Sequence, residues 1–391
     1  MSGRLLGLAI ALGALRLAGS PLHESAPFFT RISGTAVIPA EVSNDAMFVS
    51  VMINGQGPFR MQVDTGCSYS MISPDVAAAV EARGMDGDQE NAEALNGFGS
   101  IVSMPQVVLD TVSIGPVQFE GVEAGVVPLE LQSKVDSRTL DGLLGYSLFS
   151  DLFFALDFPH KSLVLSEGRP AGLPPVRAEL DVIDEVEVPY IAVRLQGRTV
   201  DVMIDSGYNG RLHLPPEALA WLKWKVKPRP GYLLAVAGQV GRGLVGRLSG
   251  DLEMGPVRQA DPVAEISPGP ASVGMGLLDS FCLVFDESGE KLWLCSPRGG
   301  PLPSPPERSV GLSLLAESGG WWVAGVMPDS PAAKAGLKEG DLATEIEGRP
   351  ARDWSREEIQ DWINTHASLA LRLSGPSGPR DVTLPVWSLV P

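Results

Sequence analysis

The sequence contains few of the residues from which metal centres and nucleophilic active sites are usually built. It has three cysteines and four histidines among 391 residues, and the histidines show none of the short spacings of metal ligands. Cys67 has no histidine near it in the sequence, so we interpret it as a small buried thiol rather than a nucleophile. The G-x-S-x-G, P-loop and zinc patterns are also absent. We therefore expect no metal ion and no organic cofactor.

Positive charge and long apolar runs are scarce as well. Thirty Lys and Arg residues against 47 Asp and Glu residues give a formal net charge of −17. No basic cluster is available to neutralise phosphates, which argues against nucleic acid as a partner. Beyond the N-terminal leader, no stretch is long and apolar enough to span a membrane. The remaining composition is rich in glycine and proline with few long helical patterns, which favours β structure and loops.

Residues 1–30 form a predicted leader. Arg4 precedes an eleven-residue apolar run, residues 5–15, and small residues follow it. This order resembles a secretory signal peptide, which implies an exported protein in the periplasm or another extracytoplasmic compartment. Arg16 and Pro21 fit a cleavage site poorly, so the alternative is an uncleaved membrane anchor or a disordered leader.

Two turns that each carry one carboxylate dominate the rest of the sequence. Residues 59–70, FRMQVDTGCSYS, alternate apolar and polar positions as a half-buried strand does and lead into Asp64-Thr65-Gly66. Residues 199–211, TVDVMIDSGYNGR, do the same for Asp205-Ser206-Gly207. A carboxylate at the end of a buried strand is costly unless it is hydrogen-bonded or shares a proton. The second copy therefore favours paired carboxylates over two unrelated surface turns.

The surroundings of the two turns repeat as well. Each turn is preceded by a strand and a tight turn, at Asn54-Gly55 in the first copy and Gln196-Gly197 in the second. Each is followed by a short segment that ends in glycine, residues 143–145 and 272–274, and the same twelve-residue spacing separates that glycine from a later aspartate. Repetition over such distances indicates a duplicated unit, each copy of which supplies one carboxylate.

These features resemble the aspartic proteases over residues 36–294. The resemblance rests on the paired D-[TS]-G turns, the hairpins before them, and the LLG and SVG segments after them. It implies a mainly β, bilobal pepsin-like fold built from two retropepsin-like lobes in one chain, as in many bacterial proteins. It also implies a catalytic pair with a supporting turn around each member, namely Asp64 and Asp205 with Thr65, Gly66, Ser206 and Gly207.

Paired carboxylates suit peptide hydrolysis because two that lie close together cannot both ionise. The ionised one takes a proton from water, and the protonated one donates to the carbonyl oxygen of a peptide bond. The expected substrate is therefore a peptide or a protein. The family also implies that the hydroxyls of Thr65 and Ser206 link the two turns, and that a flap covers the substrate. Gly97-Phe98-Gly99 is the candidate flap, with an ordinary hairpin turn as the alternative.

Two proline-rich segments divide the chain into predicted domains. Residues 169–179 separate lobe one, residues 33–168, from lobe two, residues 180–297. Residues 298–308 separate lobe two from a C-terminal domain, residues 309–389, and the stretch 296–309 around them holds five prolines in fourteen residues. Such a segment predicts an extended, semi-rigid spacer on which the C-terminal domain moves. The alternative is that the C-terminal domain packs on the lobes and completes the fold.

The C-terminal domain resembles a small α+β PDZ domain of the kind appended to bacterial proteases. Its most specific part is SPAAKAGLKEGD, residues 330–341, which predicts a short helix ended by Gly336 before a new strand. Ser355 and Glu358 predict a capping box for the next helix. The resemblance implies that a peptide C-terminus binds loop amides and adds as a strand to a sheet edge. The implied carboxylate-binding loop consists of Val310, Gly311, Leu312 and Ser313.

Two local patterns make further structural predictions. Ser73 and Pro74 predict the start of a helix that Gly84 ends. The segment from Cys282 to Cys295 predicts a hairpin that places these two thiols directly opposite each other in a non-hydrogen-bonded pair. Both a disulfide and two buried free thiols fit that register.

The sequence as a whole predicts an exported aspartic endopeptidase with a C-terminal peptide-binding module. The main alternative is a catalytically inactive peptide-binding protein or adaptor on the same fold, with the PDZ domain as its working part. Tyr208 favours this alternative, since it is bulky and stands where pepsin-like enzymes often have Ser or Thr. A weaker alternative is a dimer in which only the lobe-one turns pair.

Overall fold

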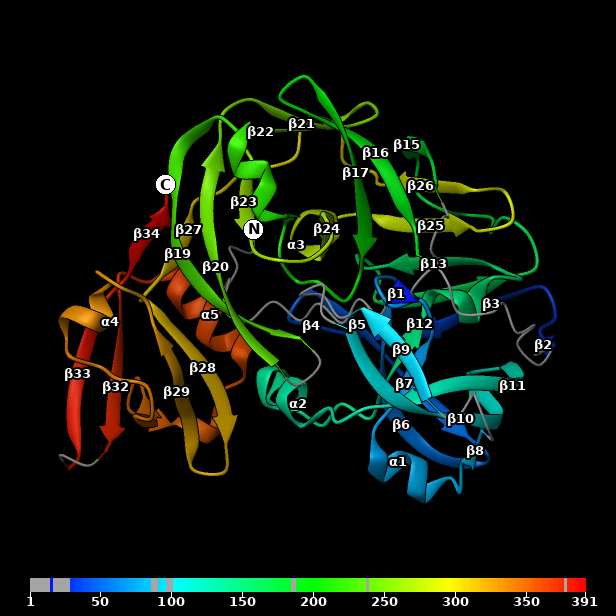
Figure 1. Ribbon diagram of the computed structural model, residues 1–391, viewed down its shortest axis with the longest axis horizontal. Helices are drawn as coiled ribbons and strands as arrows, with labels where there is room; N and C mark the ends of the chain where they lie inside the picture. The colour runs from blue at the N-terminus through cyan, green and yellow to red at the C-terminus, as the bar shows by residue number, and fades with distance from the viewer. Residues whose placement is uncertain are drawn as a thin grey trace.

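The computed structural model describes residues 15–16, 29–85, 91–95, 101–183, 188–236, 239–375 and 378–391. The chain is built mainly from strands, with a few short helices, and forms two lobes with a third domain beside them (Figure 1). No helix within the described residues is long and apolar enough to cross a membrane. The candidate flap Gly97-Phe98-Gly99, and the predicted leader apart from Leu15, Arg16, Phe29 and Thr30, lie outside the described residues.

An eleven-stranded sheet forms lobe one, and β5 illustrates why these residues make strands. Val49, Val51 and Ile53 of β5 are buried, whereas Ser50 and Met52 between them are exposed, as expected for a strand that covers a core with one face. The strands are β1 (Leu15–Arg16), β2 (Phe29–Arg31), β4 (Glu41–Ser43), β5 (Ala46–Ile53), β6 (Gln56–Asp64), β7 (Ser70–Ile72), β8 (Arg83–Gly84), β9 (Asn91–Leu95), β10 (Ile101–Ile114), β11 (Val117–Val126) and β12 (Gly142–Gly145). The helical segments are α1 (Pro74–Ala79), α2 (Glu130–Asp136) and the 3-10 turn η2 (Tyr146–Phe149).

A nine-stranded sheet forms lobe two and repeats the arrangement of lobe one around its Asp turn. Its strands are β16 (Tyr190–Leu195), β17 (Arg198–Asp205), β18 (Leu212–Leu214), β19 (Trp224–Val236), β20 (Gln239–Leu248), β21 (Asp251–Met254), β22 (Val257–Ala260), β23 (Val263–Ile266) and β24 (Ser272–Gly274). Two short helical segments accompany them, η3 (Pro216–Ala220) and α3 (Met275–Leu278).

The duplication predicted from the sequence is visible in the strand register. In lobe one, β12 runs parallel to β6 and places Gly145 opposite Asp64. In lobe two, β24 runs parallel to β17 and places Gly274 opposite Asp205. The hairpin turns before β6 and β17 also match. Both central residues of each turn, Asn54-Gly55 and Gln196-Gly197, have positive φ, as type I′ hairpin turns require.

A six-stranded sheet joins the lobes. It contains β3 (Thr35–Pro39), β13 (Phe153–Asp157), β14 (Ser162–Ser166), β15 (Val176–Asp181), β25 (Cys282–Asp286) and β26 (Lys291–Cys295), in the order β15-β26-β25-β13-β14-β3. The lobes meet where β13 pairs with β25, with Leu156 opposite Leu283. Part of the predicted interlobe linker, from Val176 onward, belongs to β15. The two Asp turns are therefore carried by lobes that share one continuous sheet.

The hairpin of β25 and β26 confirms the predicted register, because Cys282 lies opposite Cys295. Both side chains are fully buried, and both are free thiols together with Cys67. We expect the native protein to hold three reduced cysteines. Alkylation of the unfolded protein without a reducing agent should label all three thiols, as read by intact mass. Labelling of Cys67 alone would show instead that the opposed pair is oxidised.

The predicted helix after Ser73 begins as expected but ends early. Ser73 caps α1 by accepting a hydrogen bond from the amide of Val76, and Pro74 is its first residue. The predicted end at Gly84 is wrong, since α1 ends at Ala79. The reason is that Glu81 takes a left-handed conformation, with φ of 50°, and the chain then joins the sheet as β8 beside β10.

The C-terminal domain consists of a six-stranded sheet, helices on its faces, and a separate two-stranded ribbon. The sheet contains β28 (Leu312–Glu317), β29 (Gly320–Val326), β30 (Leu342–Ile346), β31 (Arg349–Pro350), β32 (Ser368–Ser374) and β33 (Arg380–Pro385), and the ribbon pairs β27 (Glu307–Ser309) with β34 (Trp387–Val390). The helical segments are α4 (Pro331–Lys334), η4 (Ala351–Asp353) and α5 (Arg356–Thr365). The predicted capping box of α5 is confirmed, as both of its hydrogen bonds are present.

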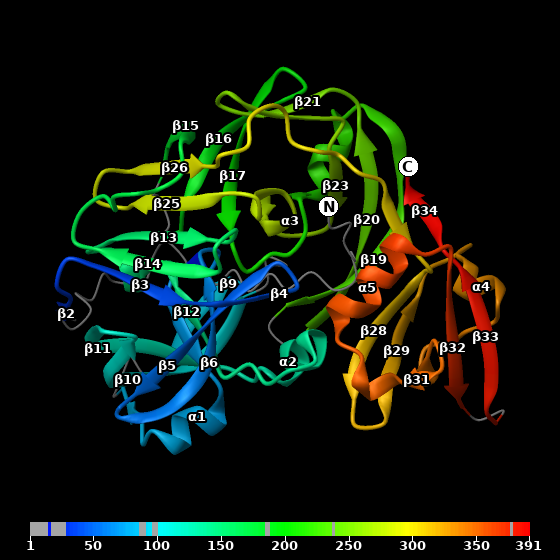
Figure 2. The same cartoon turned by 180° about the vertical axis from the view of Figure 1, so that it is seen from behind.

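The C-terminal domain packs on both lobes, so the predicted mobile spacer is wrong (Figure 2). Glu307 is fully buried in β27 and lies 2.5 Å from the guanidinium of Arg211 in lobe two. Arg247 of lobe two donates to the carbonyl oxygens of Pro305, at 2.9 Å, and of Pro391, at 2.6 Å. Buried charges need such partners, and here the linker and the C-terminus supply them. The proline-rich segment is therefore anchored on lobe two.

Candidate active site and peptide-binding groove

The two predicted catalytic aspartates meet between the lobes, at the ends of β6 and β17. The carboxyl of each lies directly over the glycine of the other turn. A Cβ atom placed on Gly66 would stand 2.5 Å from Cγ of Asp205, and one on Gly207 would stand 2.4 Å from Cγ of Asp64. Any larger residue at either position would push the carboxyls apart. The D-[TS]-G pattern thus has a steric reason in both turns.

The hydroxyls of the two turns cross between the lobes. Thr65 Oγ1 accepts from the amide of Ser206 at 3.0 Å and donates to the carbonyl of Ile204 at 2.6 Å. Ser206 Oγ accepts from the amide of Thr65 at 2.9 Å and donates to the carbonyl of Val63 at 2.8 Å. These four buried hydrogen bonds fix one turn against the other, because a buried polar group that lost its partner would be costly.

The two carboxyls have unequal hydrogen bonding. Asp64 Oδ1 accepts from the amide of Gly66 at 3.0 Å. Asp205 Oδ1 accepts from the amides of Gly207 and Tyr208, both at 2.9 Å. Both side chains are fully buried, and among the described residues no other group donates to the Oδ2 atom of either, whereas the two carboxyls hydrogen-bond each other. Asp205 therefore has one more donor to stabilise its ionised form.

This asymmetry separates the acidities of the pair. Burial, together with the neighbouring Asp205, raises the pKa of Asp64 well above its usual value. Burial also raises the pKa of Asp205, to about 7, and the amides of Gly207 and Tyr208 oppose that rise. We therefore assign the first negative charge of the pair to Asp205, to which two amides donate, and the shared proton to Asp64. A pair with one proton near neutral pH contains one acid and one base at the same time.

In the sequence, the bulk of Tyr208 favoured a catalytically inactive protein. In the structure, its side chain does not separate the carboxyls of Asp64 and Asp205. Its backbone donates to Asp205, while its ring is buried against Gly210 and Gly274, where a Cβ would stand 2.1 and 2.4 Å from the Tyr208 side chain. Its hydroxyl lies near Glu265, whose pKa burial raises to about 8. The ring therefore extends away from the carboxyls into a pocket that two glycines create.

Sequence reasoning missed one titratable neighbour of the dyad. Tyr190 lies in β16 opposite Met203, two residues before Asp205, and its partial burial and the charge of Asp205 raise its pKa. Its counterpart in lobe one is Phe48, which lies opposite Gln62, two residues before Asp64. Aligning the two copies residue by residue would have identified this position. Among the described residues, no group of His, Cys, Asp and Glu side chains has the arrangement of a metal site.

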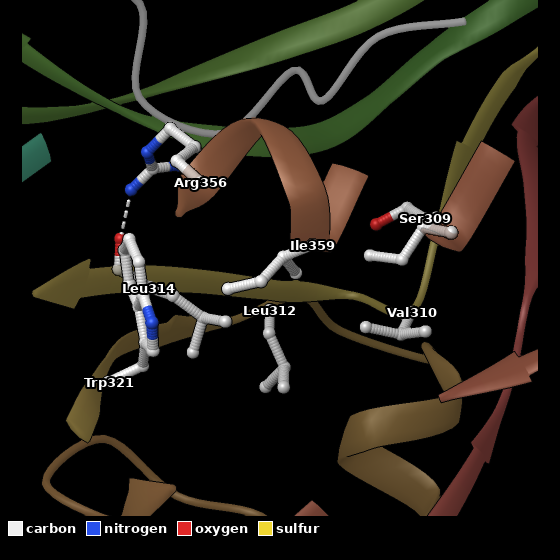
Figure 3. Close-up of a pocket in the computed structure, with 8 residues that line it drawn as sticks. Ser309, Val310, Leu312, Leu314, Trp321, Arg356 and Ile359 are labelled. Carbon is white, nitrogen blue, oxygen red and sulfur yellow. Dashed lines mark hydrogen bonds between the residues drawn. The ribbon is translucent and has the colours of Figure 1, made fainter. Parts of the chain in front are cut away.

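The second candidate site is a small pocket between β28 and α5. The predicted carboxylate-binding loop forms one end of it, where Val310 and Leu312 line the pocket, whereas Ser313 does not (Figure 3). Gly311 has φ of +87° and stands where a Cβ would clash with Ser330. The remaining lining residues are Ser309, Leu314, Trp321, Arg356, Ile359 and Ile363. The pocket is thus mainly apolar, with one guanidinium at the end opposite Ser309.

The two family models that match cover two segments of the chain, neither of which includes Asp205. Residues 49–148 match the family described as aspartyl protease, and residues 322–373 match that of the PDZ domain. A search of curated proteins gives no significant match. Among solved structures, the crystal structure of the HtrA3 PDZ domain bound to a phage-derived ligand (FGRWV) is similar at 22% identity. That match covers 21% of this chain and 88% of the other, with a TM-score of 0.20.

Proposed function

We propose that the protein is an aspartic endopeptidase whose catalytic pair is Asp64 and Asp205. An aspartyl protease domain that includes Asp64 precedes a PDZ domain in this chain. The observation that carries the proposal is the pairing of the two turns by four crossed hydrogen bonds, which holds two unequal carboxyls over each other's glycine. Thr65, Gly66, Ser206 and Gly207 serve to hold that geometry.

The proposed reaction uses both members of the pair. Ionised Asp205 takes a proton from a water molecule as the water oxygen attacks the carbonyl carbon of the scissile peptide bond. Protonated Asp64 donates its proton to the carbonyl oxygen, which gives a neutral tetrahedral diol. Collapse of the diol returns a proton to Asp64 and passes the proton held by Asp205 to the leaving nitrogen. The pair ends with one proton, as it began.

The PDZ domain is proposed to bind the C-terminal end of a peptide. The edge strand β28, the apolar pocket and the loop of Val310, Gly311, Leu312 and Ser313 support this part of the proposal. A peptide would add as a strand along β28 and place its last side chain in the pocket. The signal-like leader supports export to an extracytoplasmic compartment, and fractionation of cells that express the full chain tests it.

A catalytically inactive peptide-binding protein is the second candidate function. The observation that favours it is the complete burial of both carboxyls, since a substrate must reach Oδ2 of each. The two functions differ in a direct assay. The inactive protein would bind peptides without hydrolysing any, whereas the peptidase would release two fragments from each substrate.

The pH dependence follows from the unequal acidities. Below the pKa of Asp205, about 7, both carboxyls are protonated and no base is present. The active singly protonated pair forms as pH rises through that value and is lost when Asp64 ionises at higher pH. We therefore expect kcat/KM to rise between about pH 6 and pH 8. An optimum in strong acid would contradict the assigned ionisation states.

A further inference from the structure

Arg356, the first residue of α5, connects the peptide groove to lobe one. Its Nη2 donates to the carbonyl oxygen of Leu314 in β28 (Figure 3). Its Nε donates to the carbonyl oxygen of Val135 in α2 at 2.5 Å. The guanidinium also lies 5.5 Å from the ring centre of Trp321. The residue is only 4% exposed. A single buried cation therefore joins the groove of the PDZ domain to the protease lobe.

The position of this contact matters because β28 is the edge strand of its sheet. A peptide that adds to an edge bonds to the backbone groups that the edge leaves unpaired. The carbonyl of Leu314 is one of these groups, and Arg356 already occupies it. Figure 3 places Ser309 and Val310 at one end of the pocket and Arg356 at the other. A peptide whose C-terminus is held at the loop would run along β28 toward Arg356. The residues that precede its last few would therefore meet the Arg356 side chain.

The lobe-one side of the contact leads toward the catalytic turn. Leu315, which follows Leu314, packs into an apolar cluster with Val135 of α2. The same cluster contains Cys67 and Met71, which follow Asp64 in the chain. Leu315 and α2 therefore belong to one packed unit with the segment that leaves the Asp64 turn. Close-packed groups of this kind respond to the loss of one contact by discrete rearrangement.

We propose that a peptide C-terminus bound at β28 activates the protease by displacing Arg356. The two hydrogen bonds of Arg356, to Leu314 and to Val135, are called the latch below. One planar guanidinium makes both hydrogen bonds, so it cannot leave Leu314 to admit a peptide strand and keep its geometry at Val135. A bound peptide thus releases α2 from the PDZ domain and loosens the cluster beside Asp64. The activator is a peptide with a free C-terminal carboxylate and an apolar last residue, which the pocket side chains suit. This inference rests on the proposed function.

The groove side of the latch is tested by binding. The probe is a fluorescein-labelled pool of hexapeptides, randomised except for a C-terminal valine with a free carboxylate. The same pool with an amidated C-terminus is the control. Anisotropy is measured on the full chain in an Asp205→Asn background, so that the probe is not cleaved. Arg356→Met should bind the acid pool at least about tenfold more tightly than the parent, since a charge-assisted hydrogen bond no longer has to be broken. Lys134→Met should match the parent, because it removes only the exposed pair with Glu317 across the same interface.

The protease side is tested by the rate of hydrolysis of an amidated peptide pool, which cannot use the groove. Adding the unlabelled valine pool should raise the wild-type rate severalfold. Arg356→Met should show the raised rate without it. Equal rates with and without the valine pool would overturn the latch.

The outcomes of the two tests also separate the latch from the proposed function. Equal affinity of Arg356→Met and its parent for the acid pool would overturn the latch and leave peptide binding intact. Absence of binding in both proteins would overturn the peptide-binding function itself. Should Arg356→Met not fold, hydrogen exchange of the wild-type protein decides. The amides of α2 should exchange faster when the valine pool is bound, and unchanged exchange would overturn the latch.

Discussion

Asp64→Asn and Asp205→Asn are each expected to lower kcat for peptide hydrolysis by about 100- to 10,000-fold, the range that positioned acid–base groups contribute. Either change leaves one carboxyl, which cannot act as base toward water and as acid toward the carbonyl oxygen. Asp201→Asn is the matched control, because Asp201 lies in the same strand but is exposed. It should retain the wild-type rate.

The same variants should remain folded, and the direction in which their stability changes with pH can be predicted. The pKa of Asp205 is about 7 in the folded protein against a usual value of 3.8. Between about pH 4 and pH 7, Asp205 therefore ionises in the unfolded chain but not in the folded protein. The stability of the wild type falls over this range as pH rises. Asp205→Asn removes that loss, so its melting temperature should fall less than that of the wild type between pH 5 and pH 8. Near-wild-type turnover by Asp205→Asn would refute the two-lobe mechanism and favour a dimer that pairs lobe-one turns.

Removal of residues 298–391 is expected to destabilise the protease lobes and to abolish hydrolysis of every peptide, short ones included. The physical reason is that Glu307 leaves with the deleted segment, so that buried Arg211 loses the carboxylate 2.5 Å away. A buried charge without its partner costs about 3–5 kcal/mol. The apolar contacts of Leu389 and Val390 with Val245 and Val263 of lobe two are lost as well.

A point variant separates this effect from the loss of peptide binding. Glu307→Gln keeps the full chain and the groove but leaves the buried charge of Arg211 without its carboxylate, so it should lower the free energy of unfolding by about 3–5 kcal/mol. Lys134→Gln breaks an exposed ion pair between lobe one and the C-terminal domain and should cost less than about 1 kcal/mol. Thermal and urea unfolding measure both. A truncated protein that still cleaved short peptides at the wild-type rate would show instead that the PDZ domain is an independent tether.

The sequence predicted the features that depend on nearby residues. Hairpin turns at Asn54-Gly55 and Gln196-Gly197, the register of Cys282 with Cys295, and the cap of α5 all follow from local periodicity and turn chemistry. The pairing of the Asp turns could be inferred because the duplication repeats its own context over more than a hundred residues.

The packing of the PDZ domain on the lobes could not be predicted in this way. Arg211 and Glu307, or Val135 and Arg356, are separated by long stretches of chain, and no periodicity relates them. The prolines between the domains suggested an extended spacer by composition alone. Tertiary contacts overrode that preference, because buried guanidinium groups of lobe two bind the linker carbonyls. The role of Tyr208 was missed for a similar reason, since Gly210 and Gly274 make room for its ring only in the folded lobe.

The central claim is that Asp64 and Asp205 together hydrolyse peptide bonds, and a peptide-library digest tests it most directly. Purified full-length protein is incubated with a defined library across pH 4 to pH 9, and products are read by mass spectrometry. The wild type should generate new peptide ends near neutral pH, and a statine-type transition-state analogue should suppress them. Cleavage that the analogue leaves unchanged, or intact peptides at every pH, would contradict the claim.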